Sequence, residues 1–359
     1  MSERFLDKSR VAKRGKSLSS EEMTARLRDF VAQAESVSPE TVEVADLRRL
    51  PGGSSRLLWS VRVEIGSPSG ARSMDLVLRQ DPPGRIQKGG MQLEFHILKA
   101  AAQEGVPVPP VHWCEPESDC LGAPFFAMDR MRGETIPRRL LRDEQYHETR
   151  TRLCAQLAQT LAAIHRVDFE QSELATLQRP KDPQAVAREE VERLAAGYRA
   201  FCVEPHPVLD LAERWLLTHL PAPESLTLVH GDFRIGNIMF DEAGLVSVLD
   251  WELAHVGDPI EDLAWLCVRA WRFGEDDRPV GGLGTRESLL AEYQAAGGRA
   301  VDRSALRFWE VLGNFKLALV FITQARAYLD GAHATVELAS LGRRIAEPEA
   351  ELLVLMGED

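Results

Sequence analysis

The chain of 359 residues has few cysteines, no excess of positive charge and few lysines. Its five cysteines are an odd number without a CxxC pair, which argues against a disulfide framework or a cysteine-based zinc site and predicts reduced thiols. The net charge of −12 disfavours attraction to nucleic acid or to an anionic membrane surface. No apolar run approaches the roughly 18 residues of a membrane span. We therefore expect a soluble globular protein that binds neither nucleic acid nor a membrane.

The first 20 residues carry six Lys or Arg and two acids without periodicity, which predicts a flexible basic tail over residues 1–20. This charged start lacks the apolar segment of an export signal, so a cytoplasmic location is expected. Ser20, followed by Glu21 and Glu22 and then by regularly spaced apolar residues, predicts a capped amphipathic helix.

A small lobe is predicted over residues 21–132. Three segments within residues 41–80 are rich in β-branched and aliphatic residues and are separated by the turn clusters PGGSS and GSPSG. A helical pattern over 91–105 follows, and two further strand patterns lie at 106–114 and 123–131. One helix among about five strands indicates a small antiparallel sheet with a helix packed on it.

A larger, mainly helical lobe is predicted over residues 133–359, which makes the fold class α+β. Apolar residues recur at helical spacing over 143–166, 183–203, 207–220, 285–296, 301–329 and 335–356. Ligands often bind in the cleft between two lobes, so we expect the functional site there.

The most informative segment of this lobe is HGDFRIGN, residues 230–237, with Asp250 following 13 residues after Asn237. Apolar strand patterns precede and follow it, and a turn at 241–244 leads into a second short strand that ends at Asp250. Such a hairpin brings Asp232, Asn237 and Asp250 close together. Their carboxylate and amide oxygens are the ligands that Mg²⁺ prefers.

The spacing of Asp232 and Asn237 is that of the kinase catalytic loop HRDxxxxN. With VLDWE at 248–252 and GDPxxDLA at 257–264, the segment HGDxxxxN resembles the aminoglycoside phosphotransferase and choline kinase superfamily. The resemblance covers roughly residues 45–330. It implies a protein-kinase-like fold of two lobes, the first binding nucleotide and the second binding substrate and carrying the catalytic residues.

The resemblance implies that Asp232 is the base that orients or deprotonates an acceptor hydroxyl. Asn237 and Asp250 would bind Mg²⁺, with ATP or GTP as the phosphoryl donor and a small-molecule alcohol as the acceptor. Asp250 stands where protein kinases have the Asp of DFG. Arg234 could contact phosphate or substrate, or it could pair with an acid.

Three nearby residues are predicted to support the loop. The His230 ring is expected to hydrogen-bond the loop backbone, and Asp262 is expected to be a buried brace. Asp258, with Pro259 next and Glu261 three residues on, is expected to form a capping box for the following helix. In an alternative interpretation the chain is a phosphohydrolase whose metal cluster is formed by His230, Asp232, Asp250, His255 and Asp258.

The small lobe offers further candidates for nucleotide binding. Gly53, Ser54 and Ser55 could bring backbone N–H groups near phosphates, although such loops are also common hairpin turns. Glu94 shares the apolar face of its predicted helix, and a buried carboxylate needs a cation. Arg79, at the end of a strand, is the candidate; kinases have a lysine at this strand position, which pairs with phosphates and with a helix glutamate.

The strand pattern over 123–131 leads to the predicted junction of the lobes. Phe125 and Phe126 are expected in the core. Met128, Asp129 and Met131 are predicted to form the nucleotide hinge, because in the family the adenine meets backbone groups of the linker.

The sequence leaves more than one class of phosphoryl acceptor open. The segment VLRQDPPG, residues 77–84, resembles the branch found with acyl-CoA dehydrogenases, whose acceptors are hydroxyacyl-CoA thioesters, and Arg85 and Lys88 could then meet acceptor phosphates. The acids in the loop 275–282 could instead recognise a polycationic substrate such as an aminoglycoside, although a solvated acidic loop is the commoner case. A catalytically inactive kinase-like protein is the other alternative, because Arg79 replaces lysine and the glycine-rich loop is incomplete.

Overall fold

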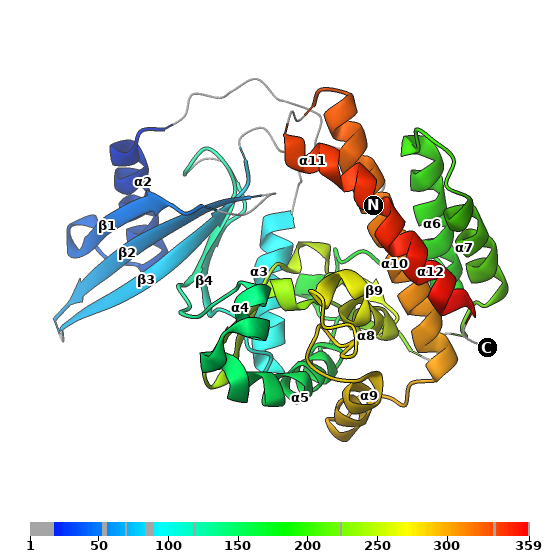
Figure 1. The fold of residues 1–359 in the computed structure, drawn as a ribbon. Coiled ribbons are helices and arrows are strands. Elements are labelled where there is room, and N and C mark those ends of the chain that lie inside the picture. Colours follow the sequence, from blue (N-terminus) through cyan, green and yellow to red (C-terminus); the bar gives the residue numbers. More distant parts are fainter. Residues whose placement is uncertain are drawn as a thin grey trace. The chain divides into compact units, whose positions relative to one another are not determined.

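The computed structural model describes residues 18–51, 56–68, 70–82, 90–117, 120–222, 225–332 and 335–357. These residues form two compact units (Figure 1). The N-terminal unit runs to Arg132 and includes the later segment Glu170–Thr176; the C-terminal unit contains Gly133–Phe169 and the residues from Leu177 onward. Most of the predicted tail lies outside the described residues, as do the candidates Gly53, Ser54, Ser55, Arg85 and Lys88.

The N-terminal unit contains the predicted antiparallel sheet. Its five strands lie in the order β1-β2-β3-β5-β4, and each pair of neighbours is antiparallel. The strands are β1 (Val42–Arg49), β2 (Leu57–Ser67), β3 (Gly70–Gln80), β4 (Val111–Glu115) and β5 (Phe125–Asp129). The helices of this unit are α2 (Ser20–Glu35) and α3 (Gly90–Gln103).

The core of this unit lies between α2 and the sheet. Met23, Leu27 and Val31 recur at helical spacing on α2 and are buried against strand residues such as Val63 and Leu76. Burying each such side chain contributes about 1.5–3 kcal/mol. This packing fixes the sheet that carries Arg79.

The cap of α2 differs from the expectation by one residue. Ser19, not Ser20, is the N-cap: its Oγ accepts a hydrogen bond from the Glu22 N–H at 3.1 Å, and the Glu22 carboxylate accepts one from the Ser19 N–H at 2.8 Å. The capping box requires the acid three residues after the cap, and Glu22 has that spacing only from Ser19.

The C-terminal unit is mainly helical, as predicted. The long helix α10 packs against α6, α7, α8, α11 and α12 (Figure 1). The helices are α4 (Pro137–Arg142), α5 (His147–Ile164), α6 (Val186–Phe201), α7 (Pro207–Thr218), α8 (Ile260–Cys267), α9 (Arg286–Ala295), α10 (Arg303–Leu329), α11 (Val336–Leu341) and α12 (Ala346–Gly357).

The prediction of a single helix over residues 335–356 is wrong. A 3₁₀ turn, Gly342–Ile345, separates α11 from α12. Pro348 lies in the first turn of α12, where its missing N–H leaves no intrahelical hydrogen bond unmade. A helix continuing from α11 would place this proline in its interior, so α12 has to begin anew.

Four short strands complete the C-terminal unit. β7 (Ile238–Asp241) and β8 (Gly244–Val248) form the predicted hairpin, with Ile238 opposite Val248. β6 (Thr227–Val229) pairs instead with β9 (His255–Gly257), a strand that the sequence did not predict. Three residues are too few to show a strand period.

Two absences can be stated for the described chain. None of its helices is both long and apolar enough to cross a membrane. All five cysteines are free, as expected from their number and spacing.

The cap assignment can be tested with neighbouring serines. Ser19→Ala removes a side-chain acceptor from the first turn of α2 and should lower the free energy of unfolding by about 1 kcal/mol. Ser20→Ala is the matched control and should change it by less than about 0.5 kcal/mol. Urea unfolding followed by circular dichroism measures both. Equal losses in the two variants would contradict the assignment.

Candidate active site

The loop that carries Asp232 follows β6 and ends in the 3₁₀ turn Ile235–Asn237. Gly231 precedes Asp232 with a φ of +79°. A Cβ at this position would lie 2.5 Å from the Leu253 carbonyl oxygen. Both the backbone conformation and the close approach therefore require glycine.

The Asp262 carboxylate holds the start of this loop. It accepts hydrogen bonds from the His230 N–H at 2.7 Å and from the Gly231 N–H at 2.9 Å. Asp262 is fully buried; burial raises the pKa of its carboxyl, but the nearby His165 ring and the His230 N–H outweigh this and lower the pKa overall. An ionised carboxylate with these donors fits the predicted bracing role.

The His230 ring links two segments of the loop. Its Nε2 donates to the Leu249 carbonyl oxygen at 3.0 Å, and its Nδ1 accepts from the Asp232 N–H at 3.2 Å. A neutral imidazole protonated on Nε2 satisfies both contacts. This geometry fits the structural role expected for His230.

Three donors surround the Asp232 carboxylate. Oδ1 accepts from the Trp265 Nε1–H at 2.7 Å and from the Arg234 Nε–H at 3.1 Å. Oδ2 accepts from the Asn237 Nδ2–H at 2.6 Å. An ionised carboxylate, which is an acceptor only, satisfies all three contacts. Trp265 was not singled out in the sequence, although it lies one residue beyond the GDPxxDLA motif.

Arg234 pairs with an acid, which is one of the alternatives left open by the sequence, and that acid is Asp232. Its guanidinium also stacks over the Trp271 ring, 4.6 Å from the ring centroid. The Arg234 side chain is 26% exposed and the Asp232 side chain 17%. Arg234 is therefore the partner of Asp232 that an incoming ligand can most readily reach.

Asn237 and Asp250, the predicted magnesium ligands, carry oxygen groups of the kind that Mg²⁺ prefers. Asn237 uses its Nδ2–H₂ group for Asp232, which leaves its side-chain carbonyl oxygen as the group for a cation. The Asn237 backbone oxygen accepts from the Leu249 N–H at 2.8 Å, which brings Asp250 beside this turn. Asp250 has a φ of +64°, in the left-handed region, and strained backbone of this kind is concentrated at functional sites.

The capping box expected at Asp258 is not formed, because the Glu261 N–H donates to the Asp258 backbone oxygen and not to its side chain. Asp258 Oδ1 accepts from the Ile260 N–H at 3.0 Å and from Arg299 Nη2 at 2.5 Å. The Glu261 carboxylate does not return to cap Asp258. It contacts His255 at 3.3 Å and Lys316 at 3.4 Å instead, and these two ion pairs satisfy its charge.

The residues of the alternative phosphohydrolase cluster have other partners. His255 contacts Glu261, and Asp258 contacts Arg299. Within the described ranges, no three His, Cys, Asp or Glu side chains gather in a way that could hold a metal ion. The loop geometry around Asp232 fits the kinase interpretation better.

Arg79 and Glu94 lie together in the N-terminal unit. Arg79 Nε is 3.0 Å from Glu94 Oε1, and Glu94 is 4% exposed on the buried face of α3. The sequence did not predict that Arg56 also pairs with Glu94 or that Arg56 Nε lies 3.2 Å from Asp81 Oδ1. Arg56 directly follows the loop PGGSS, and this position was the one feature of the sequence that could have indicated a role for it.

The predicted hinge is partly engaged in the sheet. Met128 pairs with Val77, and the Asp129 N–H donates to the Pro110 carbonyl oxygen at 2.8 Å. The Asp129 carboxylate contacts His112 Nε2 at 2.7 Å. A nucleotide contact at Met128, Asp129 or Met131 stays a prediction. Phe125 and Phe126 are fully buried, as expected.

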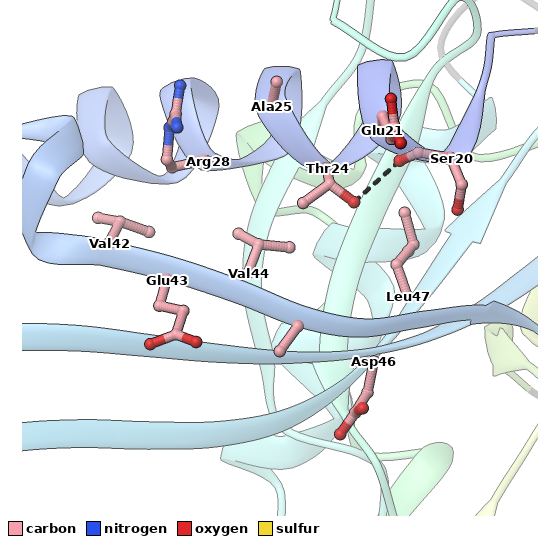
Figure 2. Close-up of a pocket in the computed structure, with 11 residues that line it drawn as sticks. Ser20, Glu21, Thr24, Ala25, Arg28, Val42, Glu43, Val44, Asp46 and Leu47 are labelled. Atoms are coloured by element: carbon pink, nitrogen blue, oxygen red, sulfur yellow. Dashed lines mark hydrogen bonds between the residues drawn. The ribbon is translucent and has the colours of Figure 1, made fainter.

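Two surface pockets lie apart from these residues. One, of about 620 Å³, runs between α2 and β1, where Thr24 Oγ1 donates to the Ser20 carbonyl oxygen (Figure 2). The other, of about 530 Å³, is lined by residues of α9, α10 and α12. Neither contains a predicted site residue.

The sequence matches the model of the phosphotransferase enzyme family over residues 46–309. It is 35% identical over 202 residues to acyl-CoA dehydrogenase family member 10 of Mus musculus, covering 54% of this chain and 18% of that protein. It is 30% identical over 300 residues to family member 11 of Gallus gallus, covering 77% of this chain and 37% of that protein. The chain thus spans less than two-fifths of these relatives.

Solved phosphotransferase structures share the fold. A Ralstonia eutropha protein provisionally classed as an aminoglycoside phosphotransferase has a TM-score of 0.74 at 21% identity, covering 93% of this chain and 98% of that one. Macrolide 2'-phosphotransferase MphH of Brachybacterium faecium has a TM-score of 0.58 at 19% identity, covering 91% and 97%. The protein-kinase-like fold is therefore confirmed.

The His255–Glu261 pair predicts a pH dependence of stability. Burial alone lowers the pKa of His255, but the Glu261 carboxylate outweighs it and raises the pKa above 6.5. The pKa of Glu261 is lowered from 4.5 to about 2, since His255 and Lys316 outweigh its burial. The stabilisation from His255 is complete below pH 6.5 and is lost as the pH rises through the raised pKa; that from Glu261 is complete above pH 4.5 and is lost as the pH falls towards about 2.

Unfolding of the wild type and His255→Gln should therefore differ most between pH 4.5 and 6.5. The difference in unfolding free energy should shrink at alkaline pH, where wild-type His255 loses its charge. Urea titrations across pH 4.5–9 measure this, and a difference that grows above pH 7 would contradict the charged pair.

Proposed function

The chain belongs to the phosphotransferase enzyme family, and we propose that it transfers the γ-phosphoryl group of ATP to a hydroxyl group of a small-molecule acceptor. The observation that carries this proposal is the fixed Asp232 carboxylate, which is bound by Asn237 and Trp265 on a loop braced by Asp262.

Asp232 performs the proton transfer in this proposal. Its carboxylate accepts the proton of the acceptor hydroxyl while that oxygen forms a bond to the γ-phosphorus. The bond from the γ-phosphorus to the bridging oxygen of ADP breaks, and ADP leaves with the electron pair. Positioning and charge stabilisation supply most of the acceleration in such reactions.

Asn237 and Asp250 would hold Mg²⁺, which supplies positive charge to the phosphate oxygens when bound. Arg79, oriented by Glu94, would contact nucleotide phosphates, and an arginine suits this role because its guanidinium pairs with carboxylate and phosphate alike. ATP is the proposed donor, with GTP as the alternative. One related phosphotransferase structure is a ternary complex with AMP-PNP and hygromycin B.

We propose a hydroxyacyl-CoA thioester or a similar metabolite as the acceptor. The curated relatives at 35% and 30% identity carry the name acyl-CoA dehydrogenase family member, which supports this class. The aminoglycoside and macrolide kinases share the fold at 21% and 19% identity, which does not extend to substrate. An antibiotic acceptor is thus the weaker alternative.

A panel of hydroxyl acceptors with Mg²⁺-ATP tests the function. ADP release should depend on a hydroxyacyl-CoA or related alcohol, and kanamycin should be a poor acceptor. Asp232→Asn keeps the size of the side chain but removes the group that accepts the proton, so turnover should fall by about 10²–10⁴-fold. Calorimetry should show nearly unchanged Mg²⁺-ATP binding.

Three outcomes would overturn this proposal. No acceptor-dependent ADP release would favour the catalytically inactive alternative. Efficient kanamycin phosphorylation would refute the metabolite class. Near-normal turnover in Asp232→Asn, or a loss of metal matching that of Asp250→Asn, would assign Asp232 a different role.

The Arg79–Glu94 pair leads to a separate prediction. Glu94→Gln weakens the orientation of Arg79 and should raise the KM for Mg²⁺-ATP about tenfold, which corresponds to roughly 1.4 kcal/mol of lost binding. The matched control is Asp75→Asn, which removes an exposed carboxylate paired with Arg62 in the same sheet. An unchanged KM in Glu94→Gln, with the protein folded, would refute the role of the pair.

A further inference from the structure

Lys316 is a buried lysine near the middle of α10. Its side chain is 8% exposed, whereas the other described lysines, Lys99 and Lys181, are exposed. The chain has 36 arginines and seven lysines, so a lysine in a buried position is a departure from its usual choice of cation. Burying an ammonium group is costly unless its hydrogen bonds are made.

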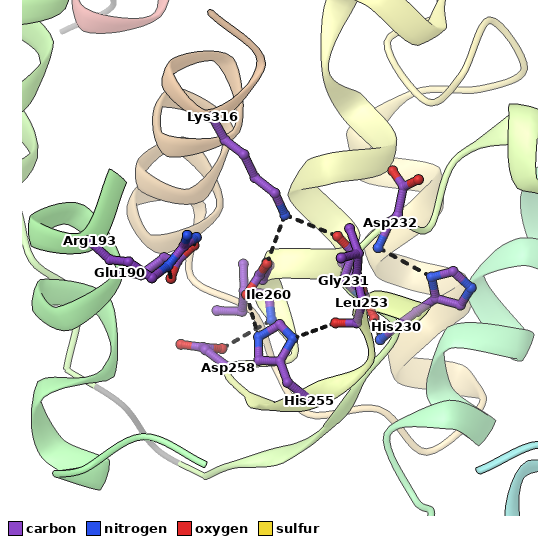
Figure 3. A network of polar contacts seen from close by, with 12 residues as sticks. Glu190, Arg193, His230, Gly231, Asp232, Leu253, His255, Asp258, Ile260 and Lys316 are labelled. Atoms are coloured by element: carbon purple, nitrogen blue, oxygen red, sulfur yellow. Dashed lines mark hydrogen bonds and ion pairs between the residues drawn. The ribbon is translucent and has the colours of Figure 1, made fainter. Parts of the chain in front are cut away.

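The Lys316 ammonium group makes three contacts, and Figure 3 shows the one with Gly231. Its Nζ donates to the Gly231 carbonyl oxygen at 3.0 Å and lies 3.4 Å from Glu261 Oε1. It also lies 4.7 Å from the centroid of the Trp265 ring. A compact ammonium group can make these contacts together, whereas the planar guanidinium of arginine directs its donors into a fork.

These contacts converge on the Asp232 backbone. The Gly231 carbonyl and the Asp232 N–H belong to one peptide unit. Lys316 binds its oxygen, and His230 Nδ1 accepts from its N–H at 3.2 Å. The peptide plane before Asp232 is thus held on both sides.

The side chain of Asp232 is held through the same lysine. Trp265 donates from its indole N–H to Asp232 Oδ1 at 2.7 Å, while its ring lies beside the Lys316 ammonium group. We propose that Lys316 is a positioning residue that sets both the backbone and the carboxylate of Asp232 for proton transfer. This inference rests on the proposed phosphotransferase function.

Stability alone does not explain the lysine. Replacing a whole buried ion pair by apolar side chains is often neutral or stabilising, so a buried charge needs a reason beyond packing. The directed hydrogen bond to Gly231 provides one. Glu261, in turn, balances the charge and is bound on its other side by His255.

Kinetics of Lys316→Met test the proposal. A small displacement of a catalytic group can cost up to about 10²-fold, so kcat should fall by about 10- to 10²-fold while the KM for Mg²⁺-ATP changes less than about twofold. Lys316→Arg keeps the charge but not the compact geometry. Its kcat should lie between that of the wild type and that of Lys316→Met.

Glu310→Gln is the matched control. Glu310 lies on the same helix, is 2% exposed and is paired with Arg286 at 2.6 Å. Among the described residues, its side chain forms no hydrogen bond or ion pair with the Asp232 loop. It should lower thermal stability and leave kcat unchanged. An equal loss of kcat in Glu310→Gln would show that the effect comes from the packing of α10 and would overturn the proposal.

A second readout does not require activity. The ¹⁵N–¹H signal of the Trp265 indole, assigned with Trp265→Phe, reports its hydrogen bond to Asp232. It should move in Lys316→Met and stay in place in Glu310→Gln. An unmoved signal in folded Lys316→Met or Lys316→Arg refutes the positioning role. If the signal moves in Lys316→Met but the wild type transfers no phosphoryl group to any acceptor, the contact holds and the proposed function is refuted.

Discussion

The loop around Asp232 depends on the Asp262 carboxylate. Two consecutive backbone N–H groups, those of His230 and Gly231, donate to its two oxygens inside the C-terminal unit. A buried carboxylate with such donors stays ionised, and buried N–H groups without an acceptor would each cost about 1–3 kcal/mol. Because α8 carries both Asp262 and Trp265, one helix fixes the start of the loop and one oxygen of Asp232. The arrangement of the Asp232 loop therefore depends on the packing of α8.

Local patterns in the sequence were enough to predict much of this arrangement. The β7–β8 hairpin, the loop HGDFRIGN and the bracing acid Asp262 lie within 33 residues of one another, where strand period, turn residues and spacing are informative. Lys316 and its contact with Gly231, 85 residues apart, could not be found in this way. No local period indicates which apolar helix brings a cation to a distant carbonyl. The strand β9 was missed for a simpler reason, its length of three residues.

The N-terminal unit shows the same division between local and distant information. The position of Glu94 on the apolar face of α3 predicted a buried acid that needs a cation, and Arg79 supplies one. The sequence did not show that Arg56 would share this acid while also pairing with Asp81. A second cation balances the second acid, so three buried charges and the partly buried Arg79 form a neutral group. The pairing of Leu57 with Gln80 brings Arg56 and Asp81 to one end of the β2–β3 ladder, and Glu94 of α3 joins them there.

The two glycines of the loop HGDFRIGN differ in what they would permit. A Cβ at Gly231 meets a backbone oxygen, that of Leu253, whereas a Cβ at Gly236 meets the guanidinium end of Arg234, a flexible side chain that can move away. Substitutions introduced into this loop by directed evolution should thus be tolerated at Gly236 but not at Gly231. Libraries selected for new acceptors should accumulate changes at Gly236 together with Arg234, while every functional descendant keeps glycine at 231.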